Sequence, residues 1–78
     1  MNIEYRTNTY TTTNDTPNAG DLVMTNEYGV WKFRQAPCPM PYWGNANACK
    51  KIVAVDGVEV NDDNKENFYD LQYKNFKQ

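Results

Sequence analysis

Aromatic side chains beside two turns are the residues of this chain best suited to recognising a partner. Tyr28 and Trp31 flank a short glycine turn, and Tyr42 and Trp43 follow three prolines between positions 37 and 41. Rigid rings on turns and proline-stiffened loops contact flat sugar rings or protein hot spots with little loss of entropy. Two asparagines follow in the same loop and supply adaptable hydrogen bonds. The candidate binding residues are Tyr28, Trp31, Tyr42, Trp43, Asn45 and Asn47.

Catalytic chemistry has few candidates in this sequence. The chain contains no histidine, the residue that most often acts as a general base or activates a nucleophile. Asp62, Asp63 and Glu66 lie in a polar stretch where a solvated turn or a helix cap is the ordinary role of such carboxylates. The four glycines are isolated, so they form no phosphate-binding loop. We therefore expect no enzyme activity, no catalytic residue and no cofactor.

The two cysteines, Cys38 and Cys49, flank the proline-rich loop. Two thiols without a histidine cannot complete a tetrahedral zinc site in one chain, so we expect no metal site. A disulfide between them would close the loop and stabilise the fold by about 2.5–3 kcal/mol. The alternative is two small buried thiols, because the sequence does not show whether the chain meets an oxidising compartment.

Charge and hydropathy limit the classes of partner. The net charge is −2, with three basic and four acidic residues in residues 1–49 and five and six in residues 50–78. This even distribution offers no basic surface for nucleic acid. The longest aliphatic run, residues 52–55, is far shorter than the roughly 20 residues that span a bilayer, and no signal peptide opens the chain. We expect a soluble protein of a bacterial cytoplasm or a phage particle, with no nucleic-acid or membrane partner.

Turn signals recur about every ten residues and divide the chain into short extended segments. The alternation in residues 1–13 indicates a first strand or edge arm, and the prolines of residues 36–47 exclude regular structure. Two hairpins are predicted, each turning at a glycine that can adopt a left-handed backbone. Their strands are residues 21–25 and 30–34, around Gly29, and residues 52–55 and 58–60, around Asp56 and Gly57.

Residues 63–76 fit two structures. Asp63 and Glu66 have the spacing of a helix capping box, whereas Tyr69, Leu71 and Tyr73 alternate with polar residues as in a strand. As a helix, the large side chains would cover about 200° of the circumference, wider than a surface stripe. We therefore favour a strand here.

The chain as a whole, residues 1–78, is predicted to be a single, mainly β domain. We expect a small antiparallel barrel or two-layer sandwich of about five or six short strands, with the C-terminal segment a strand or a short helix. Trp31 shares a strand face with Phe33, so core packing is its alternative role. An aspartate at Val53 is expected to abolish folding. The predicted core consists of Leu22, Val23, Val30, Phe33, Ile52, Val53, Val55 and Leu71.

One stretch of the chain resembles the small chitin- or cellulose-binding modules of bacterial hydrolases and phage tail proteins. Those modules contain Tyr, a turn, Gly-Asp-x-Val, a glycine turn, an aromatic strand, a proline-containing loop and a closing Trp. The corresponding residues are Tyr10, Gly20-Asp21-Leu22-Val23, Gly29-Val30-Trp31-Lys32 and Pro41-Tyr42-Trp43. The resemblance implies that Trp31 is on the aromatic strand, that Trp43 is the closing Trp, and that the ligand is an oligosaccharide.

The function we expect is a non-catalytic interaction or assembly module that binds a protein partner or copies of itself. The eleven asparagines and seven threonines fit a bacteriophage accessory protein, either a virion component or a binder of a host protein. Binding of a carbohydrate or another small ligand is the alternative, and a small enzyme is the least favoured one. Residues 36–49 are the expected functional surface; otherwise their prolines only direct the chain across a barrel end that Trp43 plugs.

Overall fold

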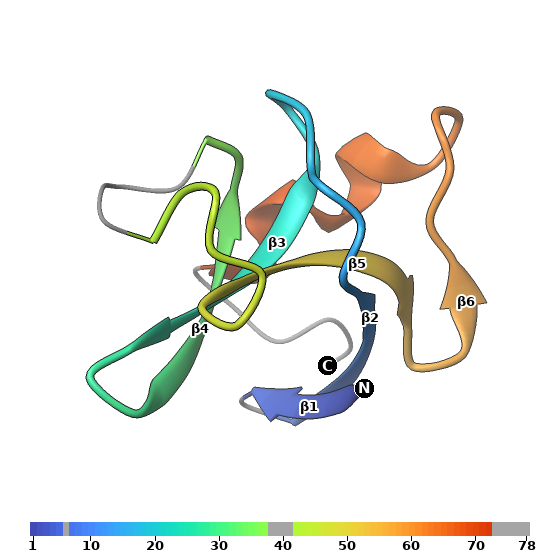
Figure 1. Ribbon diagram of the computed structural model, residues 1–78. Coiled ribbons are helices and arrows are strands. Elements are labelled where there is room, and N and C mark those ends of the chain that lie inside the picture. Colours follow the sequence, from blue (N-terminus) through green and yellow to red (C-terminus); the bar gives the residue numbers. More distant parts are fainter. Residues whose placement is uncertain (6, 38–41, 73–78) are drawn as a thin grey trace.

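A curled, antiparallel half-barrel forms the protein (Figure 1). The computed structural model describes residues 1–5, 7–37 and 42–72. In this part of the chain the sheet has the strand order β1-β2-β5-β3-β4, and β6 pairs with β5. The mainly β prediction is confirmed. The elements are β1 (Asn2–Tyr5), β2 (Asn8–Thr13), β3 (Leu22–Glu27), β4 (Val30–Gln35), β5 (Cys49–Val55), β6 (Val58–Glu59) and the 3₁₀ helix η1 (Lys65–Gln72).

Both predicted hairpins are present. Strands β3 and β4 pair from Leu22↔Gln35 to Glu27↔Val30, and β5 pairs with β6 at Val55↔Val58. Two residues at positive φ connect the strands in each case, φ 59° and 86° in the first turn and 50° and 83° in the second. Two left-handed residues in succession are typical of the type I′ turn, whose twist matches that of the strands.

The N-terminal segment differs from the prediction of a single strand. It forms the hairpin of β1 and β2, with Ile3 opposite Tyr10 and Tyr5 opposite Asn8. No Gly, Pro or Asn-Gly marks a turn between Tyr5 and Asn8, so the alternation continues across the bend and hides it.

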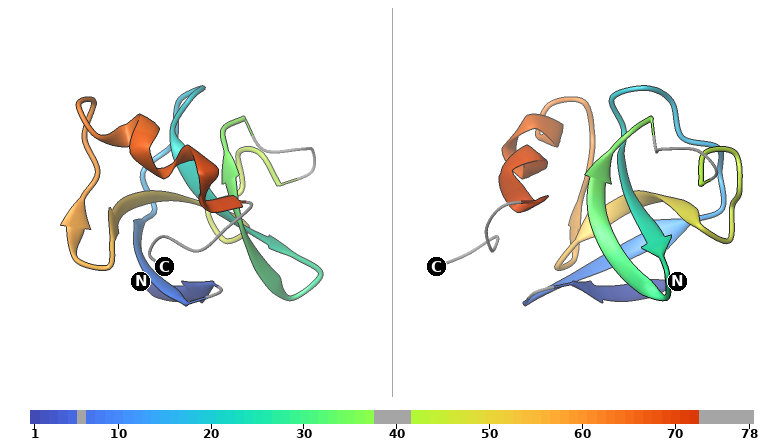
Figure 2. Two further views of the ribbon diagram at one scale, coloured as in Figure 1. Left: turned by 180° about the vertical axis from the view of Figure 1, so that it is seen from behind. Right: turned by 90° about the vertical axis from the view of Figure 1, so that its left-hand side faces the viewer.

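The two ends of the strand order, β1 and β4, are the edges of the half-barrel. Each ladder along the order is antiparallel. Five strands of alternating direction leave the first and the last parallel to each other, and no ladder joins them among the described residues. The 3₁₀ helix lies on one side of the β3–β4 hairpin, and the loop before β5 lies on the other (Figure 2).

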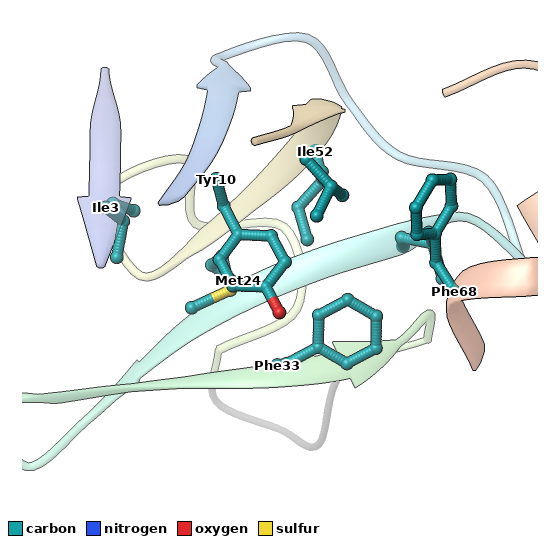
Figure 3. Close-up of a cluster of buried hydrophobic side chains, with 8 residues drawn as sticks. Ile3, Tyr10, Met24, Phe33, Ile52 and Phe68 are labelled. Atoms are coloured by element: carbon teal, nitrogen blue, oxygen red, sulfur yellow. The ribbon is translucent and has the colours of Figure 1, made fainter. Parts of the chain in front are cut away.

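Inside the curl is one cluster of buried side chains from all the longer strands and the helix (Figure 3). Two of its rings, Tyr10 and Phe33, lie 5.4 Å apart between centroids. Tyr5 and Trp31 pack against the cluster from its margin. The cluster consists of Ile3, Tyr10, Leu22, Met24, Phe33, Ile52, Val55 and Phe68.

Three residues of the predicted core are not in this cluster. Val23 is fully buried in a second cluster on the outer face of the sheet, with Ala36 and Cys49. Val30 is 57% exposed, because it directly follows the turn and pairs with Glu27 on the outer face of the hairpin. Val53 is half-buried, because the register between β2 and β5 shifts at this point and leaves it without a partner on β2. The predicted core side chain of Leu71 lies outside the described part of the structure.

Of the two structures expected for residues 63–76, the short helix is present: residues 65–72 form the 3₁₀ helix η1, so the preference for a strand is wrong there. Residues 73–76 lie outside the described part of the chain. The predicted capping box at Asp63 is replaced by one two residues earlier. The Oδ1 atom of Asn61 accepts the Asn64 N–H at 3.0 Å, and the Oδ1 atom of Asn64 accepts the Asn61 N–H at 2.8 Å. This reciprocal pair fixes the start of the helix, and Phe68 then enters the core.

Candidate binding surface at the β3–β4 hairpin

Tyr28 is the most exposed large apolar side chain of the described residues, 97% accessible to solvent, at the tip of the β3–β4 hairpin. Its backbone is left-handed, with φ 59°. Val30, 57% exposed, lies two residues further on the same tip. The tip therefore presents both an aromatic and an aliphatic side chain to solvent.

The outer face of the hairpin below this tip carries a satisfied charge network. Glu27 accepts a hydrogen bond from the Thr25 hydroxyl at 2.6 Å and two from the Arg34 guanidinium, from Nε and from Nη2. The Lys32 ammonium lies 3.9 Å from the same carboxylate. The hydrogen bond from Arg34 is the largest of the effects that lower the pKa of Glu27 from 4.5 to about 2. Glu27 is therefore a fixed anion that anchors the base of the tip.

Tyr42 joins this surface from the loop before β5. The pKa of its phenol is raised above the usual 10, first by desolvation and then by the Tyr28 phenol and the charge of Glu27, while Arg34 lowers it. The two phenols of Tyr28 and Tyr42 therefore interact, although they are far apart in the sequence. We call Tyr28, Val30 and Tyr42 the tip surface.

The other candidate residues do not converge on the tip surface. Trp31 packs against the inner cluster, whereas Trp43 packs against Val23, Ala36 and Cys49 on the outer face. The two tryptophans of the family resemblance are thus on opposite faces of the hairpin. Because Trp43 is half-buried in this outer cluster, it does not fill the barrel interior.

Asn45 and Asn47 are exposed in the loop that Trp43 anchors. The Asn47 N–H donates to Oδ1 of Asn45 at 3.0 Å, and the Asn45 N–H donates to the Tyr42 carbonyl at 3.1 Å. The same loop is held to β3 by the Asn26 N–H, which donates to the carbonyl of Ala48 at 2.8 Å. These bonds make the loop an ordered support for Tyr42.

Sequence reasoning missed the exposure of Val30 and the ion pair between Glu27 and Arg34. A signal for exposed apolar side chains at this tip is present in the turn itself. Type I′ turns favour Asn, Asp or Gly at the first central position, and this chain has Tyr28 there. A hairpin with Tyr-Gly at its tip therefore exposes its aromatic ring by construction. No signal in the sequence pairs Glu27 with Arg34, since they are seven residues apart and meet only along the strand pair.

The remaining predictions concern the cysteines, metals and membranes. Cys49 is buried and disulfide-bonded, and its predicted partner Cys38 lies outside the described residues, so their pairing stays a prediction. Among the residues that the structure describes, no three metal-binding side chains gather in one place. Nor does the described chain contain a helix with the length and hydropathy needed to cross a membrane.

Comparison with known proteins gives no relative: no protein family, no curated protein and no solved structure matches this chain.

Proposed function

We propose that this protein is a non-catalytic interaction module that binds a protein partner through the tip surface. The observation that carries the proposal is the exposed, left-handed Tyr28. A left-handed backbone costs an L-residue with a β-carbon roughly 1–2 kcal/mol. A non-glycine residue in this conformation therefore calls for a favourable interaction that offsets the cost.

In the second hairpin, hydrogen bonds within the fold offset the cost of the left-handed residue. Asp56 has the same left-handed conformation, φ 50°. Its Oδ1 atom accepts the Thr9 N–H at 2.8 Å, and its own N–H donates to the Thr9 carbonyl at 2.8 Å. Asp56 thereby ties its turn to β2, whereas the ring of Tyr28 extends into solvent. Apart from the interaction of its phenol with Tyr42, we assign the Tyr28 ring a contact outside the chain.

The surroundings of Tyr28 favour a protein as that contact. Tyrosine is enriched at the centres of protein interfaces, where its ring gives a large contact area for little side-chain entropy. Val30 adds an aliphatic contact beside it, and Lys32 places a cation at the rim. The ion pair of Glu27 and Arg34 holds the strands below the tip in place before binding, which reduces the entropy lost on association.

Carbohydrate binding has weaker support. The resemblance to sugar-binding modules assigns the aromatic contacts to Trp31 and Trp43, which lie on opposite faces of the hairpin. The asparagine- and threonine-rich composition supports a bacteriophage accessory protein as the setting, with a virion protein or a host protein as the partner.

The test compares the two hairpins. Val58 follows Gly57 as Val30 follows Gly29, and it too is an exposed valine, so Val58→Thr is the matched control for Val30→Thr. Partners are captured on the wild-type protein from host and phage lysates and identified by cross-linking, and self-association is followed by sedimentation over a range of concentrations. We expect Tyr28→Asn to lose the identified partner, Val30→Thr to weaken it, and Val58→Thr to keep it.

Retention of every partner by Tyr28→Asn contradicts the proposal. So does a strict monomer that captures nothing. Titration of tryptophan fluorescence with soluble chitin and cellulose oligosaccharides covers the alternative. A saturable response that Tyr28→Asn abolishes assigns the tip surface to sugars instead.

A further inference from the structure

Lys50 is a buried cation in a fold of modest size. It lies on β5 opposite Met24, so its side chain leaves the strand on the inner face, and the residue is only 8% exposed. Its Nζ atom donates to Oδ1 of Asn14 at 2.7 Å. Asn14 is neutral, and no carboxylate of the described residues lies within 4.0 Å of the ammonium.

The other lysine and arginine side chains of the described chain differ in this respect. Lys32 and Arg34 face Glu27, and Lys51 and Lys65 face Asp21. All of them are more exposed than Lys50. Burial of an ion without a counter-charge is unfavourable. In this chain the more exposed cations have a carboxylate partner, whereas the buried Lys50 has none among the described residues. A bound anion near Lys50 would supply the missing counter-charge.

A pocket begins at the residue that Lys50 holds. Its volume is about 40 Å³, and it lies between residues 14–17 and residues 44–49. Asn14 and Asn45 line it from the two sides. The oxygen of each amide is already engaged, by the Lys50 ammonium and by the Asn47 N–H. Neither Nδ2 group donates to another residue in the described part of the chain. The pocket therefore offers hydrogen-bond donors, with a positive charge behind one of them.

The size and polarity of the pocket define the ligand. One water-sized atom needs about 10–15 Å³ of such space, so the pocket holds about three. Carbon and two oxygens of a carboxylate match this number, and both oxygens accept hydrogen bonds. We propose that the pocket between Asn14 and Asn45 binds a carboxylate group, with Lys50 supplying the compensating charge. This site is separate from the tip surface and does not depend on the function proposed for it.

One side chain opposes an anion at this place. Asp15 also lines the pocket and is exposed. Its charge repels a carboxylate anion and limits the affinity of the pocket for it. The same residue supplies a test of sign, because Asp15→Asn removes the repulsion without touching the core.

The experiment follows the backbone amides of Ala46 and Cys49, which line the pocket, by NMR. Sodium acetate is titrated against sodium chloride at equal ionic strength, with acetamide as the neutral analogue of the same shape. We expect saturable shifts with acetate alone. Lys50→Met should weaken acetate at least tenfold, Asp15→Asn should tighten it severalfold, and Lys51→Met, a neighbour paired with Asp21, should change it less than twofold.

Two further probes identify the source of the carboxylate. N-acetylglycine represents a peptide chain end, and N-acetylglycinamide is its neutral counterpart. Tighter binding of N-acetylglycine than of acetate indicates a chain terminus of a partner, and equal binding indicates a side-chain or small-molecule acid.

Equal shifts with acetate, acetamide and chloride overturn the proposal, as does unchanged binding in a folded Lys50→Met protein. Thermal melting shows whether that variant folds. If Lys50→Met does not fold, the Asp15→Asn variant decides. Weaker acetate binding in Asp15→Asn would overturn the proposal, because it would mean that the pocket prefers a hydrogen-bond donor or a cation to an anion.

Discussion

Ile52 and Val55 both point into the core although they are three positions apart on one strand. In a regular strand, residues separated by an odd number face opposite sides. The ladder between β2 and β5 pairs Thr12 with Ile52 and Thr11 with Ala54, which leaves Val53 as an extra residue. This bulge shifts the phase of β5, so that both of its large aliphatic side chains reach the interior.

Aspartate substitutions at neighbouring positions test the bulge. Ile52→Asp should abolish folding, because it places an unpaired charge among buried side chains. Val53→Asp should leave a folded protein with a lower melting temperature, since Val53 is half-buried and lines a groove with Lys51 and Lys65. Circular dichroism melts of both variants check this. A folded Ile52→Asp protein together with loss of folding in Val53→Asp would contradict the bulge, because a regular strand in phase with Val55 turns Val53 inward and Ile52 outward.

The predictable parts of the fold are those with local chemical signals. Gly29 and the pair Asp56-Gly57 mark both type I′ turns, since few other residues enter the left-handed region freely. The bulge at Val53 carries no such signal: the run Ile-Val-Ala-Val is equally compatible with a regular strand. Its position follows from pairing with β2, which is distant in sequence.

The C-terminal helix is one of the two structures that the sequence allows, and it is the less favoured one for a different reason. A spread of about 200° of large side chains was counted against a helix. A 3₁₀ helix has three residues per turn, so that count does not apply to it. The two asparagines at positions 61 and 64 hold the spacing of a reciprocal cap, but asparagine is so frequent in this chain that the pair does not stand out.

The sequence singles out Tyr28 and Tyr42 as candidate binding residues, and that role stays a prediction. In the structure Tyr28 is exposed and Tyr42 is half-buried, and no sequence signal shows that their phenols interact. Tyr42 and Trp43 both pack against the outer cluster that contains Val23 of the hairpin. A contact between loops so far apart depends on the whole fold. The role of Trp31 was undetermined for the same reason.

Substitutions at the first left-handed position of the two turns should have opposite effects on stability. Tyr28→Asn should raise the free energy of unfolding by about 1 kcal/mol, because asparagine tolerates the left-handed backbone. A gain of this size corresponds to about 4–8 °C in melting temperature for a small domain. Asp56→Tyr should lower stability by more, since it also removes the hydrogen bond from the Thr9 N–H. Urea unfolding measures both, and destabilisation by Tyr28→Asn would mean that the ring stabilises the fold.

The acid side of the stability profile should depend on Glu27. Its pKa is about 2 in the folded protein against 4.5 for the free group, so the ionised carboxylate favours the folded state. This contribution is complete above about pH 5 and is lost as the pH falls through about 2. At pH 7, Glu27→Gln should therefore cost about 1–3 kcal/mol. The wild type and the variant should converge near pH 2. Glu59→Gln, at an exposed position, is the control that should change little.

The cap of η1 should control whether Phe68 stays in the core. Asn61→Ala removes the acceptor for the Asp63 and Asn64 N–H groups and should cost about 1 kcal/mol. Phe68→Ala should cost about 3–5 kcal/mol through the cavity that it leaves. Asn67→Ala, at an exposed position of the helix, is the matched control for the first variant. Equal melting temperatures for wild type and Phe68→Ala would show that the helix does not contribute to the core.

The contact between Tyr28 and Tyr42 can be measured on Tyr42 itself. Desolvation, the Tyr28 phenol and the charge of Glu27 all raise the pKa of Tyr42. Tyr28→Phe keeps the ring but removes the titrating hydroxyl, so we expect the pKa of Tyr42 to fall toward 10 while part of the elevation remains. Carbon-13 NMR of labelled tyrosine resolves the titration of each phenol. Tyr69→Phe on η1 is the control, and it should leave Tyr42 unchanged. An identical titration of Tyr42 in Tyr28→Phe would remove Tyr42 from the tip surface, and any partner lost by Tyr28→Asn would then be bound by the hairpin alone.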